Sequence, residues 1–73
     1  MDEQTFLQLV AEILEVDAAD VDLSGDLETL GWDSLSNISF IAEIDERVGV
    51  TIDPDALADA VTVADLRSLA SGA

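Results

Sequence analysis

The 73-residue sequence contains no cysteine and no histidine. Without cysteine, neither disulfide bonds nor a thiolate zinc site can stabilise the fold. Without histidine, the usual general base and the commonest transition-metal ligand are missing, so Ser/His and Cys/His catalytic arrangements are excluded. A mechanism based on paired carboxylates needs a substrate cleft, for which so short a chain has little room. We therefore expect one domain, residues 1–73, that is not an enzyme and holds no metal.

Basic residues are almost as scarce. Arg47 and Arg67 face seventeen acidic residues, and the formal net charge is −15. Such a surface repels nucleic acid and anionic membranes, and it favours a basic protein surface as partner. High charge can also indicate disorder, but 49% of the residues are hydrophobic and recur at helical spacing. We therefore expect a folded protein that binds other proteins.

Long apolar runs are also absent, and the chain does not begin with a basic and then apolar signal peptide. This pattern favours a cytoplasmic protein, and we expect it to be a monomer. The initial Met1 and the short ends favour a free-standing protein over a module of a larger synthase.

The pattern of apolar residues predicts a first helix over residues 3–15, capped by Asp2. One face of this helix carries Phe6, Leu7, Val10, Ile13 and Leu14. Residues 16–32 lack the periodicity, and we expect a long loop there. Four apolar residues should anchor that loop to the core: Val21, Leu23, Leu27 and Leu30.

A second helix is predicted from Ser34 to Val48, with Asp33 as N-cap and Gly49 as terminator. Its core stripe consists of Phe40, Ile41, Ile44 and Val48, flanked by Asn37 and Ile38. The opposite face carries Leu35, Ser39, Ala42 and Glu46, with Ser36 and Glu43 beside them. Glu43 and Arg47 are four residues apart and should form an ion pair that supports the helix.

The C-terminal third predicts a short helix and a longer one. Asp53 should cap the short helix, with Pro54 at its first position and Leu57 as its anchor. Thr62 and Asp65 have the spacing of a capping box for the last helix, whose apolar face is Val63, Leu66, Leu69 and Ala70. The predicted fold is all-α: a bundle of three principal helices and one short helix, with a long first loop.

The stretch "LGWDSLSNI" places Ser34 in the first turn of the second helix. The structural interpretation is that Asp and Ser simply favour helix starts. The functional interpretation is that the exposed hydroxyl is a modification site, because a phosphate ester there would lie near the positive end of the helix dipole. The chain offers Ser34 no activating base. Any chemistry at this hydroxyl must therefore be done by another enzyme.

The run "LGWDSLSNISFIAEIDERVGVTID" resembles the modification segment of acyl carrier proteins and peptidyl carrier domains, and the resemblance extends over nearly the whole chain. It implies the bundle of the acyl carrier fold. It also implies that Ser34 carries 4′-phosphopantetheine, transferred from coenzyme A by a phosphopantetheinyl transferase. The protein would hold acyl or aminoacyl groups as thioesters on this arm and present them to loading enzymes and to downstream transferases or synthases. Those partners would bind Asp33, Leu35, Ser36, Ser39, Ala42, Glu43 and Glu46.

The sequence also departs from the family pattern. Carriers of bacterial fatty acid synthesis typically have acids where this chain has Ser36 and Ser39. Asn37 and Phe40 face the core where smaller or aliphatic residues are usual. Trp32 looks more like the carriers of specialised metabolism. The resemblance therefore favours polyketide, nonribosomal peptide or amino-acid-loading pathways.

Two other functions fit the composition. Asp20, Asp22, Ser24 and Asp26, with Gly25 at the sixth place, imitate the front of a calcium-binding EF-hand loop, but its twelfth position is Gly31 and not the usual glutamate. The other alternative is an acidic helical adaptor that binds a basic partner and is never modified. It differs from a carrier only in what happens at Ser34.

Overall fold

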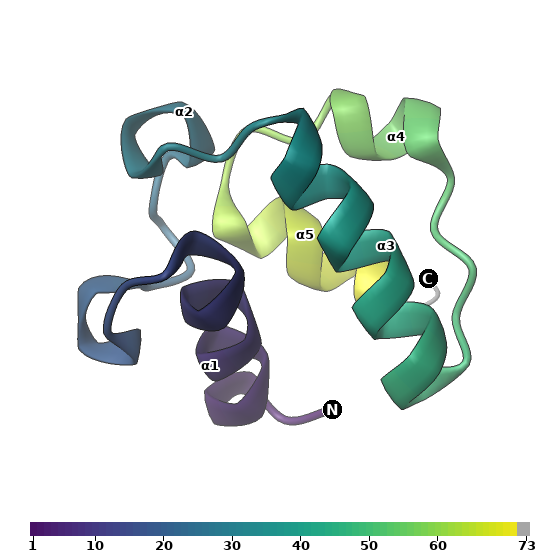
Figure 1. Ribbon diagram of the computed structural model, residues 1–73, viewed down its shortest axis with the longest axis horizontal. Coiled ribbons are helices and arrows are strands. Elements are labelled where there is room, and N and C mark those ends of the chain that lie inside the picture. Colours follow the sequence, from purple (N-terminus) through teal and green to yellow (C-terminus); the bar gives the residue numbers. More distant parts are fainter. Residues whose placement is uncertain (72–73) are drawn as a thin grey trace.

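The computed structural model describes residues 1–71 and contains helices but no strand within that range (Figure 1). The elements are α1 (Glu3–Leu14), η1 (Ala18–Asp20), α2 (Leu27–Leu30), α3 (Ser34–Val48), α4 (Pro54–Ala58) and α5 (Val63–Ala70). In the bundle, α1 packs against η1 and α3, α3 packs against α4, and α4 packs against α5. The predicted all-α bundle is confirmed.

Side-chain caps begin the helices where the sequence predicts them. The Asp2 carboxylate accepts the Thr5 amide at 2.7 Å, and Asp53 caps α4 ahead of Pro54. The Thr62 hydroxyl accepts the Asp65 amide at 3.3 Å, while the Asp65 carboxylate accepts the amides of Val61 and Thr62. Each cap supplies a partner to an amide that has none inside its own helix.

The predicted long loop contains two short helices, η1 and α2, that the sequence pattern does not indicate. Each is four residues or shorter, too short to show a helical period. The expected anchors are present: Val21 and Leu27 are buried, and Leu23 and Leu30 pack against the core. Backbone hydrogen bonds from Leu27 to Val61 (2.9 Å) and from Val63 to Gly25 (3.0 Å) join this segment to the start of α5. The first loop is therefore a fixed part of the fold.

The buried face of α1 differs from the prediction. Leu9 and Ala11 are buried together with Phe6 and Val10, whereas Leu7, Ile13 and Leu14 are only partly buried. The reason is that α1 contacts η1 as well as α3, so its buried face is set by two neighbours. The sequence pattern assumed a single apolar stripe.

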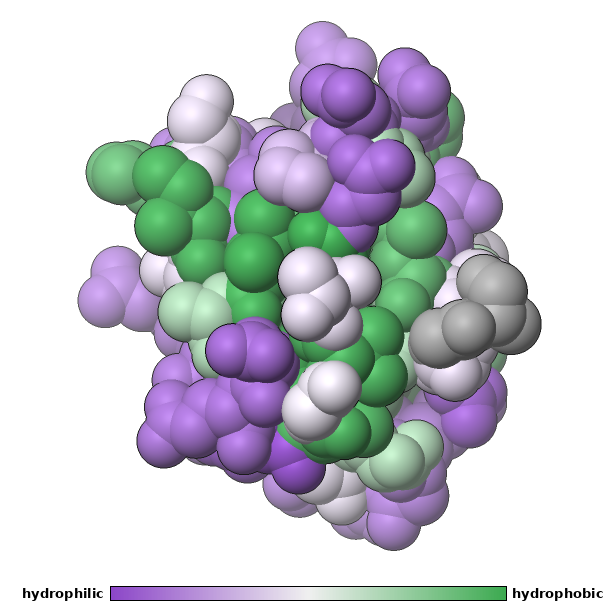
Figure 2. Space-filling view, turned by 90° about the vertical axis from the view of Figure 1, so that its right-hand side faces the viewer, coloured by the Kyte–Doolittle hydropathy of each residue, from purple (hydrophilic) through white to green (hydrophobic). Residues whose placement is uncertain are grey.

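One residue of the predicted α3 stripe, Val48, and one of the two residues predicted to flank it, Ile38, are not buried. Val48, in the last turn, is 37% exposed, and Ile38 is 64% exposed. Val48 is followed by the link from α3 to α4. Figure 2 shows the face of the molecule that carries this link, where exposed apolar side chains (green) lie among hydrophilic ones. The core stripe of α3 consists instead of Ser36, Phe40 and Ile44, with Ile41 packed beside them.

Candidate functional site

Ser34 is the first residue of α3, a helix of fifteen residues, and its side chain is exposed. Figure 1 shows the start of α3 at one end of the molecule, between α2 and α4. The side-chain hydrogen bonds of this turn join Asp33 and Ser36 and leave the Ser34 hydroxyl out. The serine is therefore accessible to another enzyme, and its oxygen lies beside the positive end of the α3 dipole.

Asp33 fixes the geometry of this helix start. Its carboxylate accepts the Ser36 amide at 3.0 Å and the Ser36 hydroxyl at 3.1 Å. These two bonds, the amide first, lower the pKa of Asp33 below its ordinary value. Asp33 therefore stays ionised and holds the turn that displays Ser34.

Ser36 differs from its predicted role as a partner-binding residue. It is only 8% exposed, and its hydroxyl is used by Asp33. On a helix, Ser36 lies one turn from Phe40, on the face that packs inward. Ser36 therefore stabilises the start of α3 through its hydrogen bonds to Asp33, and its side chain is not available to a partner.

Aromatic side chains pack beneath the start of α3, on the side that faces the core. The Trp32 and Phe40 rings meet edge to face with centroids 5.7 Å apart, and the Phe40 and Phe6 rings do the same at 5.9 Å. The Trp32 indole N–H donates to the Asn37 side-chain oxygen. As predicted, Phe40 is buried and Asn37 is half-buried. These contacts connect the segment before Ser34 to α3 and α1.

The outward face of α3 carries most of the predicted partner-binding residues. Leu35 is 73% exposed, and Ser39, Ala42 and Glu46 are exposed as well. Ile38 is not among the predicted partner-binding residues, although it lies three residues after Leu35 and four before Ala42. This spacing places the three side chains on one face and could have identified Ile38 from the sequence.

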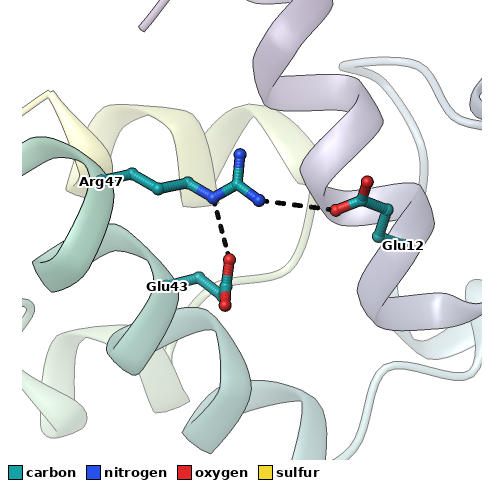
Figure 3. A network of polar contacts seen from close by, with 3 residues as sticks. All are labelled: Glu12, Glu43 and Arg47. Carbon is teal, nitrogen blue, oxygen red and sulfur yellow. Dashed lines mark hydrogen bonds and ion pairs between the residues drawn. The ribbon is translucent and has the colours of Figure 1, made fainter.

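Glu43, another predicted partner-binding residue, is engaged within the protein. Its carboxylate accepts the Arg47 Nε–H at 2.8 Å, and a second Arg47 nitrogen lies 3.7 Å from Glu12 on α1 (Figure 3). The predicted pair between Glu43 and Arg47 is confirmed. A basic partner group would have to compete with Arg47 for the Glu43 carboxylate.

The structure does not support the calcium alternative. Within residues 1–71, no group of three or more acidic side chains is arranged to hold a metal ion. Two of the candidate acids have other partners: Asp22 accepts a hydrogen bond from the Ser24 hydroxyl at 2.7 Å, and Asp26 accepts one from the Glu28 amide at 3.0 Å. In the same range, no helix is long and apolar enough to cross a membrane.

A protein family described as "Phosphopantetheine attachment site" matches residues 4–69. The chain belongs to this family. Members carry a covalently attached 4′-phosphopantetheine group, and the resemblance stated from the sequence is confirmed. An exposed serine at the start of α3 suits such a group, because the oxygen that would bear its phosphate is accessible and close to a helix N-terminus.

The carrier chain is also 30% identical, over all 73 residues, to part of the 3-methylorcinaldehyde synthase tropA of Talaromyces stipitatus. The aligned region is 3% of that protein, so the chain spans a small fraction of this relative. No solved structure matches the chain.

Proposed function

We propose that this protein carries acyl or aminoacyl groups as thioesters on a 4′-phosphopantetheine arm attached to Ser34, and that it contributes no catalysis itself. The exposure of Ser34 at the start of α3 is the observation that supports this most strongly. We propose that residues 1–73 make up a single carrier domain, as expected from the sequence. The enzymes that load, modify and release the cargo supply the chemistry.

Attachment requires a transferase and coenzyme A. The Ser34 oxygen attacks the phosphate that bears pantetheine, a phosphodiester bond to Ser34 forms, and the phosphoanhydride bond of coenzyme A breaks. The nucleotide part of coenzyme A leaves, and the hydroxyl proton passes to the transferase or to water. Within this chain, Asp33 holds the turn and the α3 dipole stabilises the ester anion.

We propose specialised biosynthesis of the polyketide or nonribosomal peptide type as the setting. The similarity to part of a 3-methylorcinaldehyde synthase favours this setting. The first two turns of α3 also carry no acid after the cap, so their surface is less negative than that of carriers with acids at these positions.

We propose that partner enzymes bind the outward face of α3, through Leu35, Ser39, Ala42 and Glu46, with Ile38 added from the structure. Exposed large apolar side chains beside a reactive group are strong candidates for binding hot spots. Leu35 and Ile38 are the two most exposed large hydrophobic residues of the described chain.

Intact-protein mass spectrometry tests the attachment. The purified protein is incubated with coenzyme A and a broad-specificity phosphopantetheinyl transferase. We expect one phosphopantetheine to be added to the wild type and none to Ser34→Ala. Ser71→Ala is the matched control, because it removes an exposed serine hydroxyl at the end of α5, outside the outward face of α3, and it should be modified like the wild type.

An unchanged wild-type mass with several such transferases would support the unmodified adaptor instead. Modification of Ser34→Ala would show that the arm is attached elsewhere.

A further inference from the structure

One hollow of the surface is lined by Ser34 itself. It has a volume of about 290 Å³ and lies between the start of α3 and the elements α2 and α4. Five of its lining residues carry polar side-chain atoms: Glu28, Trp32, Asp33, Ser34 and Asn37. Apolar residues in and next to α2 and α4 supply the rest. A group attached to the Ser34 oxygen therefore starts at the lining of this hollow, which we call the α3–α4 hollow.

The side-chain amide of Asn37 has a fixed orientation in the α3–α4 hollow. The Trp32 indole N–H can only donate, so the Asn37 atom that faces it must be the amide oxygen. Trp32 is itself held by its ring contact with Phe40, and its backbone amide donates to the Leu27 carbonyl at 2.9 Å. The Asn37 NH2 group therefore lies on the other branch of the amide, away from the indole.

This NH2 group is available to a ligand. Within residues 1–71 it donates no hydrogen bond, and no buried side-chain nitrogen lacks a partner, so the NH2 group is reached by solvent. Asn37 follows Ser34 by three residues, which places both side chains on one side of α3. Both also line the α3–α4 hollow. An acceptor attached to the Ser34 oxygen is therefore a neighbour of the Asn37 donor.

The chain offers few other donors to a phosphodiester on Ser34. Arg47 and Arg67 are its only basic side chains, and each is paired with a glutamate. In the α3–α4 hollow, the two carboxylates repel an anion, the indole N–H is already used, and the serine hydroxyl is consumed by the ester. Among the side chains that line the hollow, the Asn37 NH2 group is the donor that remains.

We infer that the Asn37 NH2 group donates a hydrogen bond to a non-bridging oxygen of the phosphodiester on Ser34, and that the Trp32 indole is the positioning group that turns the amide this way. The inference rests on the proposed attachment at Ser34. A bond to a charged oxygen is among the stronger hydrogen bonds, and this one holds the first group of the arm on the α4 side of α3. Leu35 and Ile38, which do not line the hollow, stay free for partner enzymes.

NMR spectroscopy of the isotope-labelled protein tests the inference, because the chain has few carboxamide groups. Asn37 is the only asparagine, and the other carboxamides belong to Gln4 and Gln8 of α1. On loading with phosphopantetheine, the Asn37 NH2 resonances should shift more than those of the two glutamines. Exchange of the Asn37 NH2 protons with water should slow by about threefold to tenfold, the protection that one hydrogen bond gives. Unchanged exchange would overturn the inference.

Asn37→Asp separates the donor from the acceptor. The variant keeps an oxygen for the Trp32 indole, and it replaces the NH2 group by a second oxygen that repels the phosphate. The phosphorus resonance of the loaded variant should therefore shift from its wild-type position. Gln8→Glu is the matched control, because it makes the same change from amide to carboxylate at an exposed position of α1. An equal shift in both variants, or none in Asn37→Asp, would contradict the inference.

Trp32→Phe tests the positioning role. Phenylalanine keeps an aromatic ring beside Phe40 and removes the indole N–H. In the loaded variant, the Asn37 NH2 protons should exchange as fast as in the unloaded wild type, while the resonances of Gln4 and Gln8 stay in place. If the Asn37 protons remain protected in this variant, the role assigned to Trp32 is wrong.

The outcomes separate the two proposals. If mass spectrometry shows loading at Ser34 and the Asn37 NH2 group does not respond, the inference is wrong and the carrier function stands. If the wild type is never loaded at Ser34, the carrier proposal itself fails and the inference fails with it.

Discussion

At the residue scale, Asp33 makes the stability of the site depend on pH. Its carboxylate accepts two hydrogen bonds from Ser36, and these lower its pKa in the folded protein. An unfolded aspartate has a pKa of about 3.9. The stabilisation is therefore fully present above that value, and it is lost as the pH falls through the lower pKa of the folded state.

We expect Asp33→Ala to lower the melting temperature at neutral pH, because the Ser36 amide and hydroxyl lose their acceptor. The difference between wild type and variant should disappear on acidification, below the folded-state pKa of Asp33. Thermal melts from pH 7 to pH 2 measure this difference. Comparing the wild type with the variant at each pH removes the effects of the other carboxylates, which both proteins share. A difference in melting temperature that does not change with pH would contradict the prediction.

At the element scale, α3 has two faces with separate tasks. Its inner face buries Phe40 and Ile44 completely, while its outer face displays Leu35 and Ile38 beside Ser34. Phe40 contacts the rings of both Phe6 and Trp32. The packing of the inner face therefore fixes the orientation of α3, and with it the position of Leu35, Ile38 and Ser34 at the surface.

Phe40 and Ile38, two residues apart, allow a matched test of these faces. Phe40→Ala should destabilise the fold by about 3–5 kcal/mol, a large part of the total stability of a small domain, about 5–15 kcal/mol. Ile38→Ala should change it by less than about 0.5 kcal/mol, since the side chain is 64% exposed. Urea unfolding followed by circular dichroism measures both free energies.

If Ile38→Ala is as destabilising as Phe40→Ala, the outward placement of Ile38 is wrong. With that placement, the variant should keep its stability and be a weaker substrate for the transferase and for loading enzymes.

At the scale of the whole molecule, the charge of −15 opposes compaction. Both arginines pair with acids of α1: Arg47 with Glu12 at 3.7 Å, and Arg67 with Glu3 at 3.1 Å. These pairs are exposed and individually weak. Repulsion among the many remaining carboxylates is therefore the larger electrostatic effect.

We expect the melting temperature to rise with added salt, and to rise further with divalent cations, because screening weakens this repulsion more than it weakens the two arginine pairs. Thermal melts from 10 mM to 500 mM NaCl measure the effect. Over this range the Debye length falls about sevenfold. A melting temperature that does not change with salt, or that falls, would show that the ion pairs dominate.

The sequence by itself determined four of the helices, α1, α3, α4 and α5, and their starts. A cap depends on residues within three positions of one another, as with Asp33 and Ser36 or Thr62 and Asp65, so it can be predicted without knowing the fold. The same local reasoning placed Ser34 in the first turn of a helix, and the motif around it indicated the family.

Only the tertiary structure decided which side chains are buried and which are available to partners. Ile38 faces outward, Ser36 faces inward, and Glu15 adopts a left-handed conformation at the end of α1. The physical reason is that burial depends on neighbours supplied by distant parts of the chain. The packing of α1 against α3 and of the first loop against α5 creates those neighbours, and no periodicity within a single helix contains that information.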